Sequence, residues 1–156
     1  MGRRALPFLA LAIAAAQAPK YTGPVPAKPD LPFLKHANNL VATEPVEFKE
    51  DKRGDDVLYT APGESSPSRT PLALPIFLLK SEKLNPARLQ MYRLESKEGH
   101  REITLSAKKK ADVIHVLVTR LTPDGLYRLE VFDGLESGEY VLSLDGANQG
   151  FCFRID

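Results

Sequence analysis

Residues 137–155 read SGEYVLSLDGANQGFCFRI, and this stretch decides the fold class. Apolar side chains occupy every second position in two runs, at Tyr140, Leu142 and Leu144 and then at Phe151, Phe153 and Ile155. A period of two is typical of β-strands that bury one face. Ser137-Gly138 precedes the first run and Asp145-Gly146 follows it, and both pairs favour turns. The stretch therefore predicts two consecutive strands joined by a turn.

The same pattern extends back through most of the chain. Further alternating or apolar runs, separated by turn residues such as Glu98-Gly99 and Pro123-Asp124-Gly125, cover residues 46–48, 57–59, 76–79, 89–94, 103–107, 113–118 and 127–131. Short strands at such spacing, with Gly, Pro and Asp turns, predict an all-β protein, an antiparallel β-sandwich of about 7–9 strands.

Three local patterns make this prediction more specific. Pro75 is expected to precede the strand at residues 76–79, because proline cannot donate to a sheet. The alternation slips at Met91-Tyr92, which predicts a β-bulge or a strand end. Residues 113–118 are apolar on both faces and rich in β-branched side chains, which predicts a central strand covered on each side.

The first residues have the features of an export signal. Arg3-Arg4, an apolar stretch and an Ala-x-Ala end predict a signal peptide at residues 1–16, and cleavage after Ala18 is the alternative. The apolar stretch is shorter than the about 20 residues that cross a bilayer. We therefore expect an exported protein, periplasmic or extracellular, without an integral membrane span.

Residues 17–32 are expected to form a Pro-rich extension ahead of a β-sandwich domain at residues 33–156. Their prolines favour an extended polyproline II conformation, which suits a spacer or a strap. Residues 33–41 then place apolar side chains at helical spacing behind Asp30, a possible N-cap. One short helix is therefore a possibility there, although Asn38-Asn39 weakens the pattern.

The charge balance argues against a nucleic-acid partner. The chain has 21 Lys and Arg against 20 Asp and Glu, and loss of Arg3 and Arg4 with the signal peptide leaves a formal charge of −1. A near-neutral protein lacks the basic surface that nucleic acids or anionic membranes attract. A single cysteine, Cys152, rules out an intramolecular disulfide.

Two resemblances bear on fold and setting. Residues 135–142, Leu-Glu-Ser-Gly-Glu-Tyr-Val-Leu, resemble the corner of immunoglobulin-like sandwiches, in which a tyrosine hydroxyl bonds back to nearby backbone. Leu142 stands where those domains usually have a disulfide cysteine, and the likeness implies an immunoglobulin-like sandwich with a packing role for Tyr140. Residues 29–37, 66–78 and 151–156 are similar to a group of uncharacterised exported bacterial proteins, which implies an envelope or secreted setting and no chemistry.

No spacing of reactive side chains predicts a catalytic, cofactor-binding or metal site, and we therefore expect a protein that is not an enzyme and has no cofactor. The candidates considered were the histidines, without metal-ligand spacing, and the loop serines, without a nucleophile elbow: His36, His100, His115, Ser65, Ser66 and Ser68. The serines are interpreted as loop residues.

Three other features have a structural and a functional interpretation. Cys152 faces away from Phe151 and Phe153, either in a second core layer or at the surface, and is expected to be inert although Arg154 shares its face. Arg53-Gly54-Asp55 is expected at a hairpin tip, where the turn itself requires Gly and Asp. The triplet at residues 108–110, with Arg101 and Arg120 nearby, is expected to be a solvated strand end that discourages aggregation.

Three functions are compatible with these patterns. The first is a non-catalytic sandwich that mediates protein contacts at the bacterial cell envelope, where a sheet edge could recruit a partner strand. The alternative is a carbohydrate or small-molecule binding module that uses exposed aromatics, with Tyr21, Tyr59, Tyr92 and Tyr127 as candidates. The third is a hydrolase whose site combines His36 or His115 with a carboxylate and a loop serine. The partner and the oligomeric state stay open.

Overall fold

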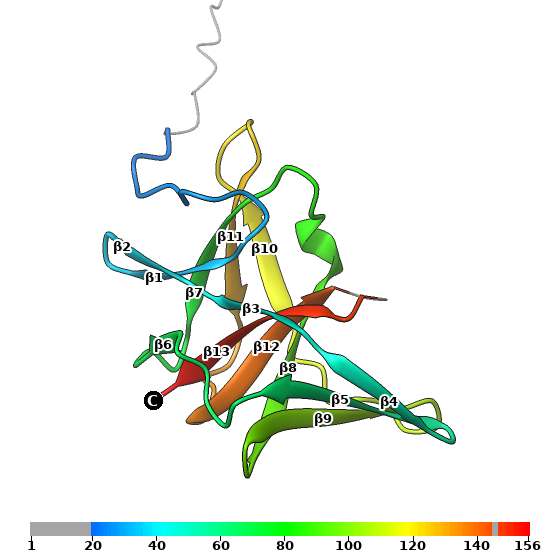
Figure 1. The fold of residues 1–156 in the computed structure, drawn as a ribbon. Helices are drawn as coiled ribbons and strands as arrows, with labels where there is room; N and C mark the ends of the chain where they lie inside the picture. The colour runs from blue at the N-terminus through cyan, green and yellow to red at the C-terminus, as the bar shows by residue number, and fades with distance from the viewer. Residues whose placement is uncertain (1–19, 145–146) are drawn as a thin grey trace, which may run out of the picture.

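The computed structural model describes residues 20–144 and 147–156, and the regular secondary structure of these residues is almost entirely β-strand (Figure 1). The predicted signal peptide lies outside the described residues. The strands are β1 (Phe33–His36), β2 (Asn39–Ala42), β3 (Glu44–Glu47), β4 (Lys49–Arg53), β5 (Asp56–Pro62), β6 (Arg69–Thr70), β7 (Ile76–Lys80), β8 (Leu89–Lys97), β9 (His100–Ser106), β10 (Val116–Arg120), β11 (Leu126–Val131), β12 (Gly138–Leu144) and β13 (Gln149–Ile155). One short 3-10 helix, η1 (Pro86–Arg88), precedes β8.

Two sheets pack against each other. The five-stranded sheet has the order β10-β11-β7-β1-β2, and the eight-stranded sheet has the order β3-β13-β12-β8-β9-β5-β4 with β6 beside β13. Only the β6 pairing is parallel among the strand pairs of the described chain. The predicted all-β sandwich is confirmed. The strands outnumber the expected 7–9 because β1, β2 and β6 are too short for a clear alternation, and because β4 consists of charged, exposed residues without apolar positions.

The first core lies between the two sheets. The five-stranded sheet contributes Leu34, Phe77, Leu79 and Leu129, and the eight-stranded sheet contributes Leu89, Met91, Tyr140, Leu142, Phe151, Phe153 and Ile155. Phe153 joins the two layers, because its ring lies 5.0 Å from that of Phe77 and 5.6 Å from that of Tyr140. The alternation that is visible in residues 137–155 therefore marks the face of β12 and β13 that is turned toward the first core.

The other face of the eight-stranded sheet holds a second core. The end strands of this sheet, β3 and β4, are consecutive in the chain and separated only by Phe48, so the sheet curls round on itself. Its inner side encloses Val46, Phe48, Ala61, Tyr92, Leu94, Val141 and Cys152. The strands β8, β12 and β13 are consequently covered on both faces.

This arrangement corrects two predictions from the sequence. β8 runs without a break through Met91 and Tyr92, in regular register with β12, because Met91 faces the first core and Tyr92 the second. What resembled a slip in phase is a strand buried on both sides. Residues 113–118 are not a central strand: β10 begins at Val116, forms the edge of the five-stranded sheet, and leaves Leu117 44% exposed.

The possible helix at residues 33–41 is a β-hairpin. β1 pairs with β2 on one side and with β7 on the other, and the chain turns between them at Ala37, whose φ is 52°. Leu34 is buried in the first core, whereas Val41 is 37% exposed. The apolar spacing therefore fits a helix by coincidence, and pairing with the central strand β7 decides the conformation.

The described part of the Pro-rich extension, residues 20–32, is a strap that lies against the body. Pro26 and Pro32 are buried, and the Asp30 N–H donates to the Lys80 carbonyl at 2.8 Å. The Asp30 carboxylate accepts hydrogen bonds from the backbone N–H groups of Glu82, Lys83 and Leu84, and these bonds lower its pKa although burial opposes them. β7 begins at Ile76, directly after Pro75, as predicted.

Candidate functional site

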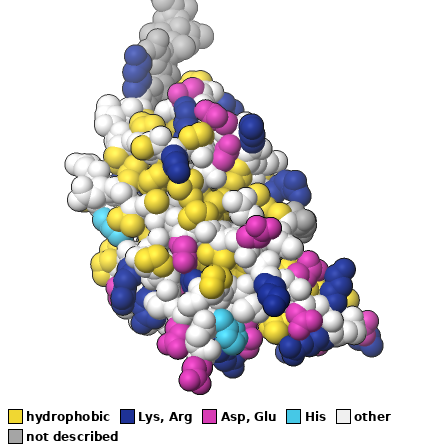
Figure 2. All heavy atoms as spheres, in the orientation of Figure 1, with side chains coloured by type: hydrophobic (Ala, Val, Ile, Leu, Met, Phe, Trp, Pro, Cys, Tyr) yellow, Lys and Arg dark blue, Asp and Glu magenta, His cyan; other side chains and the backbone are white. Residues whose placement is uncertain are grey.

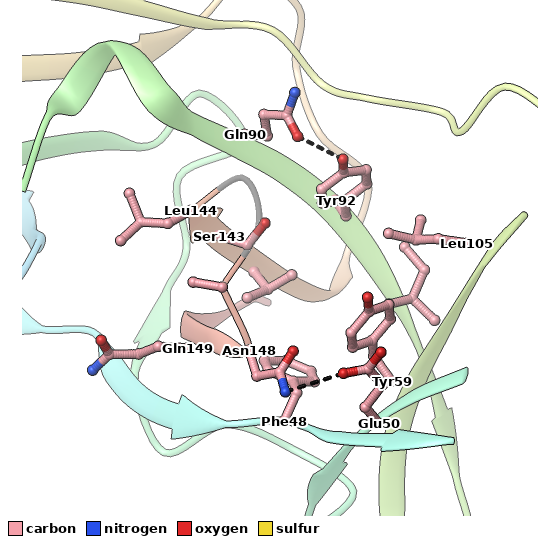
Figure 3. Close-up of a pocket in the computed structure, with 13 residues that line it drawn as sticks. Phe48, Glu50, Tyr59, Gln90, Tyr92, Leu105, Ser143, Leu144, Asn148 and Gln149 are labelled. Atoms are coloured by element: carbon pink, nitrogen blue, oxygen red, sulfur yellow. Dashed lines mark hydrogen bonds between the residues drawn. The ribbon is translucent and has the colours of Figure 1, made fainter. Parts of the chain in front are cut away.

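A pocket of about 350 Å³ opens on the concave side of the eight-stranded sheet, next to the second core (Figure 3). It is lined by Phe48, Glu50, Tyr59, Gln90, Tyr92, Ile103, Leu105, Val141, Ser143, Leu144, Ala147, Asn148 and Gln149. Small-molecule sites in proteins are of about this size and combine apolar walls with a few polar groups.

The curl of the sheet brings the pocket residues together. Phe48 lies where β3 passes into β4, and Glu50 follows it two residues later, so both side chains lie on the concave side. Tyr59 on β5 is the direct partner of Glu50 in the β4–β5 register. Tyr92 comes from β8, on the far side of β9. Strands that are distant in sequence thus place three aromatic rings around one cavity.

A glycine keeps one wall of the pocket compact. A Cβ atom at Gly150 would lie 2.5 Å from Val141 Cγ2 and 2.8 Å from Phe48 Cε2. Both contacts are far shorter than van der Waals distance, so only glycine lets β13 approach these two side chains.

Hydrogen bonds fix the polar side of the pocket. The Tyr92 hydroxyl donates to Gln90 Oε1 at 2.8 Å, and Asn148 Nδ2 donates to Glu50 Oε2 at 3.3 Å, as the dashed lines in Figure 3 show. The pKa of Tyr59 is raised, first by burial and then by the negative charge of Glu50. Glu50, Asn148 and Gln149 are exposed, whereas Tyr92 and Val141 are buried, so the polar groups form the rim and the apolar groups the floor.

The described lining residues include one aliphatic hydroxyl, that of Ser143, and no histidine or cysteine. Two of the four tyrosines considered from the sequence, Tyr59 and Tyr92, line the pocket. The other two lie elsewhere, since the Tyr21 hydroxyl donates to the Pro24 carbonyl within the strap and Tyr127 lies under Arg120.

Sequence reasoning missed the rim. Glu50, Asn148 and Gln149 sit in segments that the sequence marks only as polar, and their convergence depends on β3 and β4 belonging to opposite ends of one sheet. One signal in the sequence was available: Phe48 and Glu50 are two residues apart, which places both side chains on the same face of a strand.

The three histidines are far from forming one site. His36 Nε2 is 2.8 Å from the Thr70 hydroxyl, His100 Nε2 is 3.1 Å from Glu102 Oε2, and His115 is exposed. Among the hydrogen bonds of the described residues, none joins one histidine to both a hydroxyl and a carboxylate. The described part of the chain also contains no group of three or more His, Cys, Asp or Glu side chains placed to hold a metal ion.

The loop serines are ordered by a buried carboxylate. Glu139, 2% exposed, accepts hydrogen bonds from the Ser66 N–H at 2.6 Å and the Ser65 hydroxyl at 3.3 Å, and it pairs with Arg154 at 2.9 Å. Ser66 and Ser68 are buried. These serines lie in the loop between β5 and β6, as predicted, and Glu139 and Arg154 hold this loop against β12 and β13.

Cys152 occupies the second core, one of the two positions expected for it. Its side chain has no exposed surface, and burial raises the pKa of the thiol to about 12, although Arg101 opposes the shift. Arg101 itself is fully buried and therefore does not lie on the surface beside residues 108–110. Residues 108–110 follow the end of β9 and are exposed, as expected of a solvated strand end, and Arg120 belongs to the other sheet.

Hydrophobic and charged side chains occupy different regions of the outer surface. On the face in Figure 2, hydrophobic side chains gather across the middle, and charged side chains crowd the tip of the β4–β5 hairpin. Arg53-Gly54-Asp55 lies at this tip as predicted, where Arg53 Nε donates to Asp51 at 3.0 Å and Lys108 lies 3.0 Å from Asp55.

Apolar side chains are exposed at the five-stranded sheet and its loops. Leu72, Leu74, Leu117 and Phe132 are 41%, 53%, 44% and 68% exposed. The loops that carry three of them are in contact, because the Leu135 N–H donates to the Ala73 carbonyl at 2.7 Å. Exposed apolar side chains that cluster in this way are typical of interaction surfaces.

None of the helices in the described residues has the length and the apolar character needed to cross a membrane. The chain matches no family model, no curated protein and no solved structure.

Proposed function

We propose that this protein is a non-catalytic binding module that holds a small molecule in the pocket of the curled sheet. The observation that carries the proposal is the meeting of Phe48, Tyr59 and Tyr92 around a cavity of about 350 Å³. Polar side chains at the rim can orient a ligand, and the buried floor can cover its apolar part.

Filling the pocket tests the proposal. The neutral fluorophore N-phenyl-1-naphthylamine becomes brighter in apolar sites. It is expected to bind the unaltered protein but not the Leu105→Trp variant, because the larger tryptophan ring occupies the cavity. Thr104→Trp is the matched control, because Thr104 is exposed and lies on the opposite face of the same strand. Equal binding by both variants, or no binding to the unaltered protein, would refute the proposal.

Mediation of protein contacts is the second candidate. Two observations favour it. Four apolar side chains are exposed and available to pack against a partner: Leu72, Leu74, Leu117 and Phe132. In addition, β10 is an edge strand, to which a partner strand could pair. Cross-linking with mass spectrometry in the native host is expected to recover a reproducible partner at these residues. Phe132→Glu is expected to remove that cross-link, and a pattern unchanged by this variant would count against the surface.

We also propose export, supported by the pattern of residues 1–16. Protein from the native host is expected to begin at Gln17, which N-terminal sequencing can determine. An intact initiator methionine on cytosolic protein would contradict export and leave the pocket proposal untouched.

A further inference from the structure

The pocket carries one ionised side chain. Of its described lining residues, Glu50 is the only one with a charge, and no Lys or Arg is among them. The Glu50 carboxylate accepts one hydrogen bond, from Asn148, and makes no ion pair with a described residue. No described basic side chain therefore neutralises the negative charge at this rim.

The walls beside Glu50 are aromatic. Tyr59 is its register partner across β4 and β5, and Tyr92 and Phe48 complete the apolar side (Figure 3). Aromatic rings attract cations electrostatically, and they cover the apolar part of an organic molecule. No hydrogen bond joins the Tyr59 hydroxyl to the described residues, and since no buried polar atom there lacks a partner, this hydroxyl is accessible to solvent.

We infer that the ligand is an organic cation with an apolar, preferably aromatic, body, such as a hydrophobic amine. This inference rests on the proposed function of the pocket and names the chemical class that it accepts. The apolar body lies on the floor against Tyr92, and the ammonium group lies at the rim between the Glu50 carboxylate and Tyr59. An anion of the same shape meets the Glu50 charge without a compensating base, and its binding is therefore disfavoured.

Three probes of one shape separate charge from fit. 1-Naphthylmethylamine, 1-naphthalenemethanol and 1-naphthoate share a ring system and are a cation, a neutral molecule and an anion at pH 7. Dissociation constants from NMR titration of the full mature chain are expected to rank amine, alcohol, acid, with the amine about fivefold tighter than the alcohol, as for partly exposed charge pairs.

Two variants test the role of Glu50. Glu50→Gln is expected to remove the preference for the amine over the alcohol. Glu47→Gln changes the net charge equally and is expected to keep the preference, because Glu47 is exposed, does not line the pocket and lies only three residues away. The preference of the unaltered protein for the amine over the alcohol is also expected to decrease as the salt concentration rises from 50 to about 500 mM. This measurement does not depend on how any variant folds.

The possible failures are distinguishable. Equal affinity for the amine and the alcohol, or a preference that survives in Glu50→Gln, would overturn the cation inference and leave the binding module intact. If neither the three probes nor the neutral fluorophore bound to the unaltered protein, the pocket proposal and the cation inference would both be overturned.

Discussion

Arg101 and Glu44 form an ion pair within the fold: Arg101 Nη1 lies 2.7 Å from Glu44 Oε1, and the Arg101 side chain has no exposed surface. The same guanidinium donates to the backbone carbonyls of Pro62 and Gly63, at 2.7 and 2.9 Å. One side chain on β9 therefore joins β3 to the end of β5.

Removal of this guanidinium is expected to be strongly destabilising. Arg101→Met leaves Glu44 and two carbonyls without their donor, and loss of one partner of a buried pair costs about 3–5 kcal/mol. Urea unfolding measures the change. Arg53→Gln is the control, because its ion pair with Asp51 is exposed and contributes about 0–1 kcal/mol. Similar costs for the two variants would contradict the structural role of Arg101.

Cys152 is expected to make stability depend on alkaline pH. Burial raises its thiol pKa to about 12 from 9.0, so the unfolded chain releases the proton first. The contribution is complete below pH 9 and is lost as pH rises toward 12, with a slope of at most about 1.4 kcal/mol per pH unit. Unfolding curves from pH 8 to 11 are expected to fall more steeply for the unaltered protein than for Cys152→Ala. Parallel curves would show that the thiol does not carry this dependence.

The hydroxyl of Tyr140 is expected to contribute measurably to stability. It donates to the Glu136 carbonyl at 2.7 Å, the bond that the resemblance to a sandwich corner implies, and the ring is 2% exposed. Tyr140→Phe keeps the stacking on Phe153 and is expected to cost about 1–2 kcal/mol in thermal or urea unfolding. Tyr127→Phe, at a half-buried ring, is expected to change stability by less than about 0.5 kcal/mol.

The close approach at Gly150 predicts overpacking by a single methyl group. Gly150→Ala forces Val141 and Phe48 apart and is expected to cost about 1–3 kcal/mol and to weaken binding of the neutral fluorophore. Val141→Ala in the same chain is expected to recover part of the stability. Gly134→Ala is the control, since its nearest contact is at 3.9 Å. Full stability of Gly150→Ala would show that β13 does not need glycine there.

The fold class was predictable because alternation and turn chemistry are local. Residues 137–155, the start of β7 after Pro75 and the turn at Glu98-Gly99 all follow from neighbouring residues, and the structure confirms them. The immunoglobulin-like assignment goes further, to the connectivity of the strands, and stays a prediction.

Burial on two faces could not be read from the same signals. Met91-Tyr92 looks like a phase slip because the alternating pattern applies to strands with one solvent-exposed face, whereas β8 is buried on both faces. Residues 113–118 look like a central strand because they are apolar, although their outer side faces solvent. Which run becomes central depends on pairing between distant segments. The pocket has the same origin, since Glu50 and Asn148 converge only after β3 and β13 pair.

The continuity of β3 and β4 has a consequence for how the molecule is made. The curled sheet closes only when Glu44 to Glu47 meet β13, which lies near the opposite end of the chain. Pairing over so long a sequence separation slows folding, and a growing chain exposes the apolar side chains of β8 and β12 until that last partner arrives. Vectorial synthesis therefore leaves these apolar side chains without their cover until Gln149 to Ile155 have been made.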